Sequence, residues 1–257
     1  MFNHESVAVL IPALNEEGHI IDIVSAAFRV QIQGNRVCDR VIVCDNGSTD
    51  ETAKNAARAG AEVVFEGKRG YGAACQAMLA YLVAHDPPDL VVFLNADGAE
   101  DPAELLDLLA PLQARADLVI GSRTLGNAGK GAMLPQQRFG NALACALVRL
   151  FWQAKVTDLG PYRAVRYKKL LELNMQDQNF GWTIEMQLKA IKCGLSIFEI
   201  PVTTSSSIGA SKISGTIKGF CGATYKILGY IFYYAFLELF PNVKKVKKQR
   251  EVGGRNA

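Results

Sequence analysis

The sequence predicts an α/β protein with a mostly parallel central sheet flanked by helices. Short, nearly continuous apolar runs alternate with helix-like segments through the first half of the 257-residue chain. Strands that are apolar on both faces are typical of a parallel sheet covered by helices on each side. A polar cluster follows each of several apolar runs, at the carboxyl end of the predicted strand. Parallel sheets bind their ligands at that edge. The chain is 49% hydrophobic, so it can bury a full core as one large domain, or as one domain with an appendage.

The elements of the first half follow from this alternation. The expected strands are residues 7–11, 41–44, 62–65, 90–94 and 118–121. Asn15 can cap the helix after the first strand. The side chains that this helix is expected to bury are Ile20, Ile21, Ile23, Val24 and Phe28. Ser48 or Thr49 can cap the helix after the second strand, and Pro102 can open one after the fourth.

The second half begins with a Gly-rich, irregular stretch at 121–135, which suits a mobile loop over a site. Helices are expected at 136–155, 168–173 and 182–193, and a strand at 195–202. Residues 227–237 are uncharged and rich in Tyr and Phe, but too few to span a bilayer, which needs about 20. They can form a core helix or an amphipathic helix on a membrane. The basic tail that follows favours the second alternative.

Composition narrows the classes of function. The six Cys form no C-x-x-C and there are three His, which argues against a Cys/His zinc site or a His-dependent triad. Cys44 and Cys145 lie in apolar runs as small core residues, and a reduced, cytoplasmic setting is expected. The polar N-terminus has no signal-peptide pattern. After Pro241 the chain carries six Lys and Arg against one Glu; the rest is not basic, so no nucleic-acid partner is expected.

The most informative stretch is the acidic loop that follows the run 90–94. Asp97, Glu100 and Asp101 crowd carboxylates at the end of a predicted strand. Such a cluster favours a hard divalent cation bound together with a diphosphate. Glu100 and Asp101 also suit the dipole at the start of the helix that Pro102 opens. Asp97 lies too far before that helix for the helix dipole to account for it.

A second polar loop, residues 67–74, is rich in glycine. Glycines before a helix let backbone N–H groups approach a phosphate, and Lys68 and Arg69 supply positive charge. Cys75 stands where a dinucleotide-binding loop has its third glycine, and no P-loop Lys-Ser/Thr follows. Those two classes of phosphate site are therefore not favoured.

Taken together, the motifs resemble family-2 glycosyltransferases with the GT-A fold in order and spacing. The matching motifs are IPALNEE at 11–17, VCDNGSTD at 43–50, the glycine-rich loop at 67–74 and NAD at 95–97. Further motifs resemble the polyprenyl-phosphate sugar transferases of the dolichol-phosphate mannosyltransferase type. They are GSR at 121–123, DLGPYRA at 158–164 and GASK at 209–212.

The resemblance implies a domain organisation. Residues 1–215 would form a catalytic domain, with a nucleotide-sugar-binding half at 1–121 and an acceptor-binding half at 122–215. Residues 216–257 would form a C-terminal amphipathic helix and basic tail that can attach to a membrane. The expected location is therefore cytoplasmic, peripheral on the inner face of the cell membrane.

The resemblance also implies roles for individual residues. The donor, a UDP- or GDP-linked sugar, would be held by Pro12, Leu14, Asn15, Glu16, Asp45, Gly47, Lys68, Gly72, Asn95, Ala96 and Lys212. Asp97, with Asn95, would bind the Mg²⁺ or Mn²⁺ that bridges the diphosphate. Arg123 and Arg138 would face an acceptor phosphate, because the guanidinium fork matches phosphate oxygens. Asp45 has a local alternative as the cap of a turn.

The nature of the acceptor decides whether a base is needed. A lipid phosphate is already anionic, so positioning and electrostatic stabilisation suffice, and attack opposite the diphosphate inverts the anomeric carbon. A hydroxyl acceptor would need a general base, for which Asp158 and Glu185 are the candidates. Inverting transfer to a polyprenyl phosphate is the leading hypothesis, and a soluble acceptor is the first alternative.

Two positions depart from the family pattern. Asn95 stands at the first acid of the usual D-x-D, where Glu100 and Asp101 can make up the missing charge. The serines at 205–207 stand where relatives carry an Arg before the Gly-x-Ser-Lys motif. These departures motivate a further alternative, a non-catalytic homologue that binds nucleotide sugars.

Overall fold

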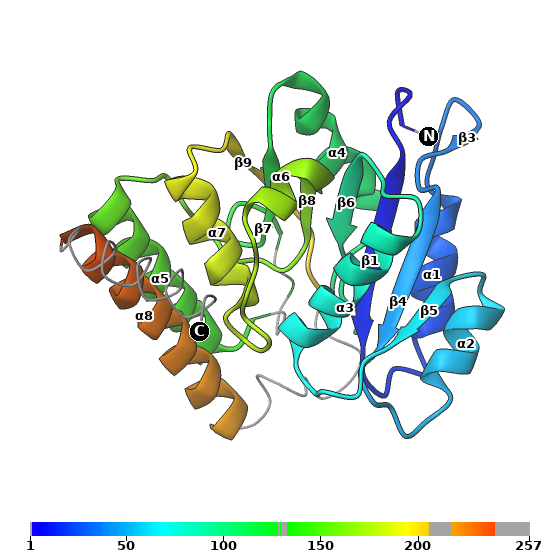
Figure 1. Cartoon of the computed structure of the whole chain (residues 1–257), viewed down its shortest axis with the longest axis horizontal. Helices are drawn as coiled ribbons and strands as arrows, with labels where there is room; N and C mark the ends of the chain where they lie inside the picture. The colour runs from blue at the N-terminus through cyan, green and yellow to red at the C-terminus, as the bar shows by residue number, and fades with distance from the viewer. Residues whose placement is uncertain (1, 128, 130–132, 206–216, 240–257) are drawn as a thin grey trace, which may run out of the picture.

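The computed structural model describes residues 2–127, 129, 133–205 and 217–239. Within these ranges the chain has an α/β fold, in which a seven-stranded sheet carries helices on both faces (Figure 1). The seven strands are β1 (Val7–Ala13), β4 (Arg40–Asp45), β5 (Glu62–Phe65), β6 (Leu90–Phe93), β7 (Leu118–Ser122), β8 (Arg163–Arg166) and β9 (Ile197–Pro201). Their order is β5-β4-β1-β6-β8-β7-β9.

The mostly parallel sheet predicted from the sequence is confirmed, with one strand that the prediction missed. Strand β8 lies between β6 and β7 and is antiparallel to both, while the other neighbouring pairs are parallel. The prediction also missed a short hairpin, β2 (Gln31–Ile32) with β3 (Asn35–Arg36). Parallel neighbours place the carboxyl ends of β1, β4, β5 and β6 at one edge of the sheet, where the polar loops meet.

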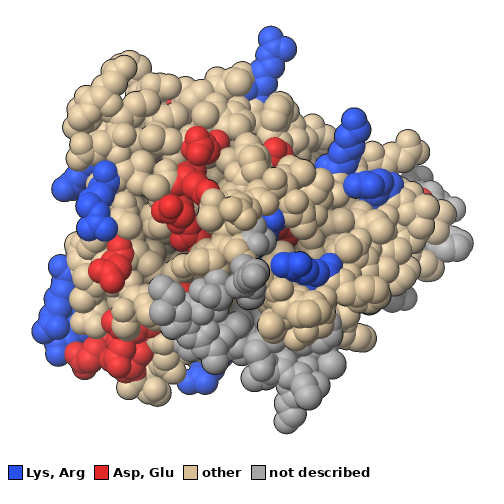
Figure 2. Space-filling model, turned by 180° about the vertical axis from the view of Figure 1, so that it is seen from behind, with Lys and Arg blue, Asp and Glu red and all other residues tan. Residues whose placement is uncertain are grey.

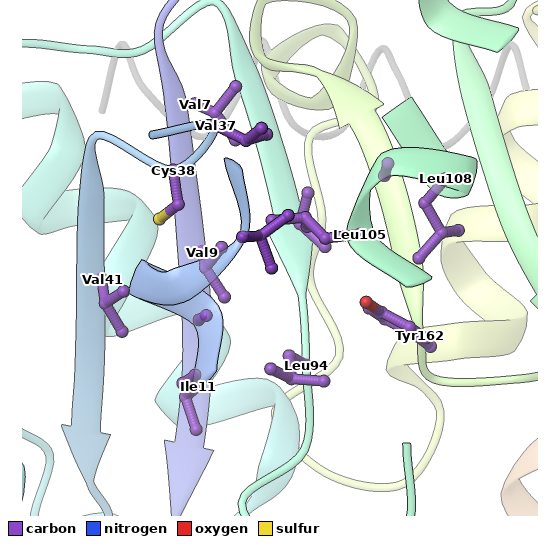
Figure 3. Packing of buried hydrophobic residues seen from close by; sticks show 14 of the residues in the cluster. Val7, Val9, Ile11, Val37, Cys38, Val41, Leu94, Leu105, Leu108 and Tyr162 are labelled. Carbon is purple, nitrogen blue, oxygen red and sulfur yellow. The ribbon is translucent and has the colours of Figure 1, made fainter. Parts of the chain in front are cut away.

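The helices cover the sheet in layers. They are α1 (Ile20–Arg29), α2 (Thr52–Arg58), α3 (Tyr71–Ala84), α4 (Leu105–Ala114), α5 (Pro135–Trp152), α6 (Tyr167–Glu172), α7 (Trp182–Lys192) and α8 (Ile217–Leu239), with a 3₁₀ turn, η1 (Pro102–Glu104). Side chains alternate along β1. Val9 and Ile11 pack with α1 and α4, and Figure 3 shows Leu105 and Leu108 of α4 on their side of the sheet. Ala8 and Leu10 pack with α3 and α7.

Helices α5 and α8 form a third layer beyond the sheet. They lie side by side in Figure 1 and share a buried cluster with α7 that includes Val148, Leu188 and Ile231. Phe232 and Leu239, also on α8, are 53% and 71% exposed. The core-helix alternative for residues 227–237 is therefore confirmed for one side of α8, and the membrane-helix alternative stays a prediction for its exposed side. No helix in the described ranges is long and apolar enough to span a bilayer.

The caps predicted for the helices after β1 and β4 were wrong. Helix α1 begins at Ile20, and the Asn15 side chain accepts from the Thr49 N–H at 2.7 Å instead. Helix α2 begins at Thr52, whose N–H donates to Asp50 at 3.1 Å rather than to Ser48 or Thr49. Ile21 is 41% exposed, although a buried position was expected. Asn15 and Ser48 bind across neighbouring loops instead of capping these helices, and Asp50 binds the first residue of α2.

Candidate active site

The loops after β1 and β4 bind each other at the carboxyl edge of the sheet. The Asn15 N–H donates to the Ser48 hydroxyl at 2.9 Å, and the Glu16 N–H donates to the Thr52 hydroxyl at 2.7 Å. This interlock brings together one group of the residues expected to hold the nucleoside. The group is Pro12, Leu14, Asn15, Glu16, Asp45 and Gly47.

Asp45 and Gly47 shape the turn at the end of β4. The Asp45 side chain is buried and its Oδ1 accepts from the Ser48 N–H at 2.9 Å, which is the turn-capping geometry of the local alternative. Gly47 has a φ of +80°, which favours glycine. Its carbonyl accepts from Arg69 at 3.4 Å. This turn is therefore preformed beside the β1 loop.

The glycine-rich loop packs against the chain instead of opening toward a ligand, which corrects the role expected of Gly72. The N–H groups of Gly72 and Ala73 donate to the carbonyls of Asn179 and Gln178 at 3.3 and 2.9 Å. The Lys68 ammonium likewise donates to the Gln178 side chain. A Cβ on Gly72 would lie 2.1 Å from the Asp177 carbonyl oxygen. The glycines are needed here because another backbone approaches α3 closely.

Gly72→Ala is accordingly expected to cost about 3 kcal/mol or more of unfolding free energy, since it overpacks a rigid backbone contact. Gly140→Ala is the matched control, because nothing lies within 4 Å of a Cβ there. It should stabilise α5 by about 0.5–1 kcal/mol. Urea denaturation of both variants checks the pair. Equal stabilities would contradict the close approach at Gly72.

The acidic loop separates its carboxylates into different environments. Asp101 is exposed and caps η1, accepting from the Ala103 N–H at 2.9 Å, as its place before the helix predicted. Asp97 is half-buried and accepts from the Ala99 N–H at 3.2 Å. Glu100 is only 5% exposed, so it is not the helix-terminal acid that the sequence suggested. Burial, together with the charge of Asp97, raises the pKa of Glu100 to about 8.

The residues of this loop fit a hard cation in part. Asp97, Asn95 and Glu100 offer carboxylate and amide oxygens, the ligand type that Mg²⁺ and Mn²⁺ take. One oxygen of Glu100, Oε2, is buried without a hydrogen-bond partner. In the described ranges no three His, Cys, Asp or Glu side chains are placed to hold a metal. The protein therefore supplies an incomplete ligand set, which a diphosphate could complete.

Arg123 and Asp158 form a buried ion pair on the other side of the site. Asp158 is fully buried and accepts from the Arg123 N–H at 2.7 Å, from Nε at 2.9 Å and from Nη2 at 2.7 Å. Burial lowers the pKa of Arg123, but the hydrogen bonds and charge of Asp158 raise it above its ordinary value. Both carboxylate oxygens are engaged with Arg123, so the geometry makes Asp158 the anchor of this guanidinium rather than a base.

The loop that carries Asp158 is itself held by two polar side chains, the half-buried Glu199 and the buried Asn141. Glu199 accepts from the Thr157 N–H at 3.0 Å and from its hydroxyl at 2.7 Å. Asn141, on α5, donates to the Thr157 carbonyl and accepts from the Leu159 N–H at 2.9 Å. Sequence reasoning missed both residues, whose only signal is that polar side chains interrupt apolar segments.

Arg123 and Arg138 line one open pocket of about 430 Å³. It lies between the loop after β7 and the first half of α5, and Asn141, Ala142 and Thr157 also line it. The structure therefore brings together the two arginines that were expected to face a phosphate. They are 15 positions apart in the chain, and α5 supplies the second.

Glu185, the other candidate base, has a structural role. It is 1% exposed, accepts from the Asp177 N–H at 2.7 Å and pairs with Lys189 at 2.7 Å. These contacts hold the loop that packs on Gly72. Lys212, expected to close over phosphates, lies outside the described residues, as do the serines at 206–207.

Fold and site together define a class. The mostly parallel sheet, with one antiparallel strand and helices on both faces, matches the GT-A fold of glycosyltransferases. The chain belongs to glycosyl transferase family 2, whose profile matches residues 8–174. It is a glycosyltransferase.

Relatives and solved structures agree with this assignment. The chain is 34% identical to an uncharacterised glycosyltransferase of Mycobacterium tuberculosis, over 84% of this chain and 93% of that protein. It is 30% identical to the polyprenol monophosphomannose synthase of Mycolicibacterium smegmatis, over 81% of each chain. It also shares its fold with glucosyl-3-phosphoglycerate synthase from M. tuberculosis, solved with Mn²⁺, UDP and glucosyl-3-phosphoglycerate. That match has a TM-score of 0.66 at 20% identity and covers 92% of this chain and 80% of that one.

Proposed function

We propose that this glycosyltransferase moves a sugar from a nucleotide diphosphate to a polyprenyl phosphate at the inner face of the cell membrane, with inversion at the anomeric carbon. Residues 1–121 would hold the donor, residues 122–215 the acceptor, and the C-terminal segment the membrane. The name of the mycobacterial polyprenol monophosphomannose synthase supports a polyprenyl acceptor.

One observation carries this proposal: the arginine pocket lies beside an apolar stripe that faces solvent. Phe139, Leu143, Ala146 and Leu150 are exposed on α5 at helical spacing, and Phe139 and Leu150 are 71% exposed. Arg138 and Ala142, which line the pocket, adjoin the first two of these positions on the same helix. A phosphate pocket beside an apolar surface suits an acceptor that has an anionic head and a lipid tail.

Helix α8 extends the apolar surface. Phe232 is 53% exposed and its ring meets Phe151 of α5 edge-on, with 6.1 Å between the centroids. Figure 2 shows the molecule from behind, with α5 and α8 on the right. That side shows mainly uncharged atoms interrupted by a few Lys and Arg side chains. Apolar surface with scattered basic residues suits the interface of an anionic membrane.

The donor side would work through the loops after β1, β4 and β6. The β1 and β4 loops would bind the nucleoside, and Asp97 with Asn95 would hold Mg²⁺ or Mn²⁺ on the diphosphate. When bound, the metal neutralises charge that develops on the leaving nucleoside diphosphate. Arg123 and Arg138 would hold the acceptor phosphate for attack, and Asp158 would fix the direction of Arg123. An anionic acceptor needs no general base, in keeping with the engaged carboxylates of Asp158 and Glu185.

Incubation of the protein with membranes, Mg²⁺ and labelled nucleotide sugars tests this function. We expect labelled product that extracts into organic solvent and that depends on the added protein. Label that appears only in water-soluble product would show a soluble acceptor and contradict the lipid assignment.

Phe139→Asp should weaken binding to anionic lipid vesicles about 10-fold or more, because inserting one Phe side chain contributes about 1.5–3 kcal/mol. Phe65→Asp is the matched control, since Phe65 is also 71% exposed but lies on β5, far along the sheet from α5. Vesicle co-sedimentation measures both. Equal binding by the two variants would argue against α5 as the membrane face.

A further inference from the structure

Two buried side chains beside the acidic loop share an unusual feature. Glu100 and Thr204 face each other across an isolated antiparallel bridge. Residues directly opposite in such a bridge point to the same side. They are 5% and 3% exposed, and each has a buried oxygen without a hydrogen-bond partner, Oε2 of Glu100 and Oγ1 of Thr204. Leaving such groups unpaired is costly, so this place is built for a polar or charged neighbour.

The other oxygen of Glu100 is bound to the residue that departs from the family pattern. The Asn95 side-chain Nδ2 donates to Glu100 Oε1 at 3.3 Å. An amide that donates through its nitrogen has its carbonyl oxygen left as the atom that can ligate a cation. Asp101 cannot take this place, because it is exposed and caps η1.

Burial and the negative charge of Asp97 disfavour the ionised carboxylate of Glu100, whereas Arg123 favours it. A divalent cation beside Asp97 would turn that repulsion into attraction. Partners that orient a metal ligand and adjust its charge affect metal affinity nearly as strongly as the ligand itself.

We propose that Glu100 is a positioning residue that supplies, through its hydrogen bond to Asn95, the negative charge that the asparagine lacks toward the metal. The pair Asn95 and Glu100 then carries the charge that one aspartate carries in the usual D-x-D. This inference rests on the proposed metal-dependent donor site, and it assigns the missing charge to one side chain.

A double-mutant cycle on Mn²⁺ binding tests the proposal, with UDP or GDP present and free Mn²⁺ measured by electron paramagnetic resonance. Glu100→Gln should weaken Mn²⁺ binding about 10- to 100-fold in the native background. In the Asn95→Asp background the same change should have less than about a threefold effect, because the introduced carboxylate then supplies the charge. Glu104→Gln is the control, since Glu104 accepts from the Thr203 N–H on the same side of the loop and should leave Mn²⁺ binding unchanged.

Each outcome is decisive. Equal effects of Glu100→Gln in both backgrounds, or none in the native one, would overturn the inference while leaving the donor site intact. A Glu100→Gln protein that fails to fold, judged by circular dichroism, would also overturn it, because the carboxylate would then serve the fold. If the native protein binds Mn²⁺ no better than the free nucleotide does, the proposed function fails together with the inference.

Discussion

Asp97→Asn is expected to lower kcat/KM about 10³-fold or more, a loss of about 4 kcal/mol of transition-state stabilisation. Position 95 is an amide in this chain, so Asp97 is the one acid at the two D-x-D positions. Its side chain is half-buried in the loop after β6, where it would hold the metal on the diphosphate of a donor whose nucleoside the β1 and β4 loops would bind. Steady-state kinetics across a range of Mn²⁺ concentrations measure the loss.

The control for Asp97 is Asp107→Asn, the same chemical change at an exposed position of α4. It should leave kcat/KM within about twofold, because surface substitutions act weakly. If Asp97→Asn kept activity within about fivefold of the native protein, the role of Asp97 at the metal would be contradicted, and the acid would have to be sought elsewhere.

Asp158→Ala is expected to lower the unfolding free energy by about 3–5 kcal/mol, because it leaves the Arg123 charge without its partner in a mostly buried site. The Arg123 side chain is 20% exposed and Asp158 is 0% exposed. Glu172→Ala is the control, since its pair with Lys169 is exposed and should contribute less than about 0.5 kcal/mol. Urea denaturation measures both variants.

Asp158→Asn separates anchoring from base catalysis, because the amide keeps the size of the side chain. If Asp158 holds Arg123, the variant should raise KM for the phosphate acceptor and keep the shape of the pH–rate profile. Loss of the acidic limb of that profile would instead identify Asp158 as a general base and contradict the anchoring role.

The strands were predictable where their residues are apolar on both faces. The expected 62–65 coincides with β5, and the other parallel strands differ by a few terminal residues. Strand β8 was missed because Arg163 and Arg166 interrupt its apolar pattern. Arg163 is 1% exposed and binds the carbonyls of Gly160 and Thr183 at 2.6 and 2.8 Å. Those partners come from packing that no local pattern reveals, and burial lowers the pKa of Arg163 to about 10.

The glycine-rich loop shows why a motif can predict a conformation and miss its cause. Close approach of a phosphate and close approach of another backbone both exclude a Cβ, so the two causes leave the same glycines in the sequence. The backbone that approaches Gly72 belongs to Asp177, far along the chain.

The prediction that Glu100 is a helix-terminal acid was wrong for a related reason. Its place before Pro102 is typical of a helix-terminal acid, but in the structure it is buried and pairs with Thr204, about a hundred positions further along the chain. The arginine pocket was the opposite case. The family resemblance implied that Arg123 and Arg138 face a phosphate, and the structure places both in one pocket between the loop after β7 and α5.

The most direct test of the proposed function is sugar transfer by the purified protein to defined acceptors, with Mn²⁺ and labelled UDP- and GDP-sugars. Polyprenyl phosphate, the corresponding polyprenol and phosphoglyceric acid separate the lipid tail from the phosphate. We expect transfer to polyprenyl phosphate to be at least about 100-fold faster than to either of the others. Comparable transfer to phosphoglyceric acid or to the phosphate-free alcohol, or transfer to none of the three, would contradict it.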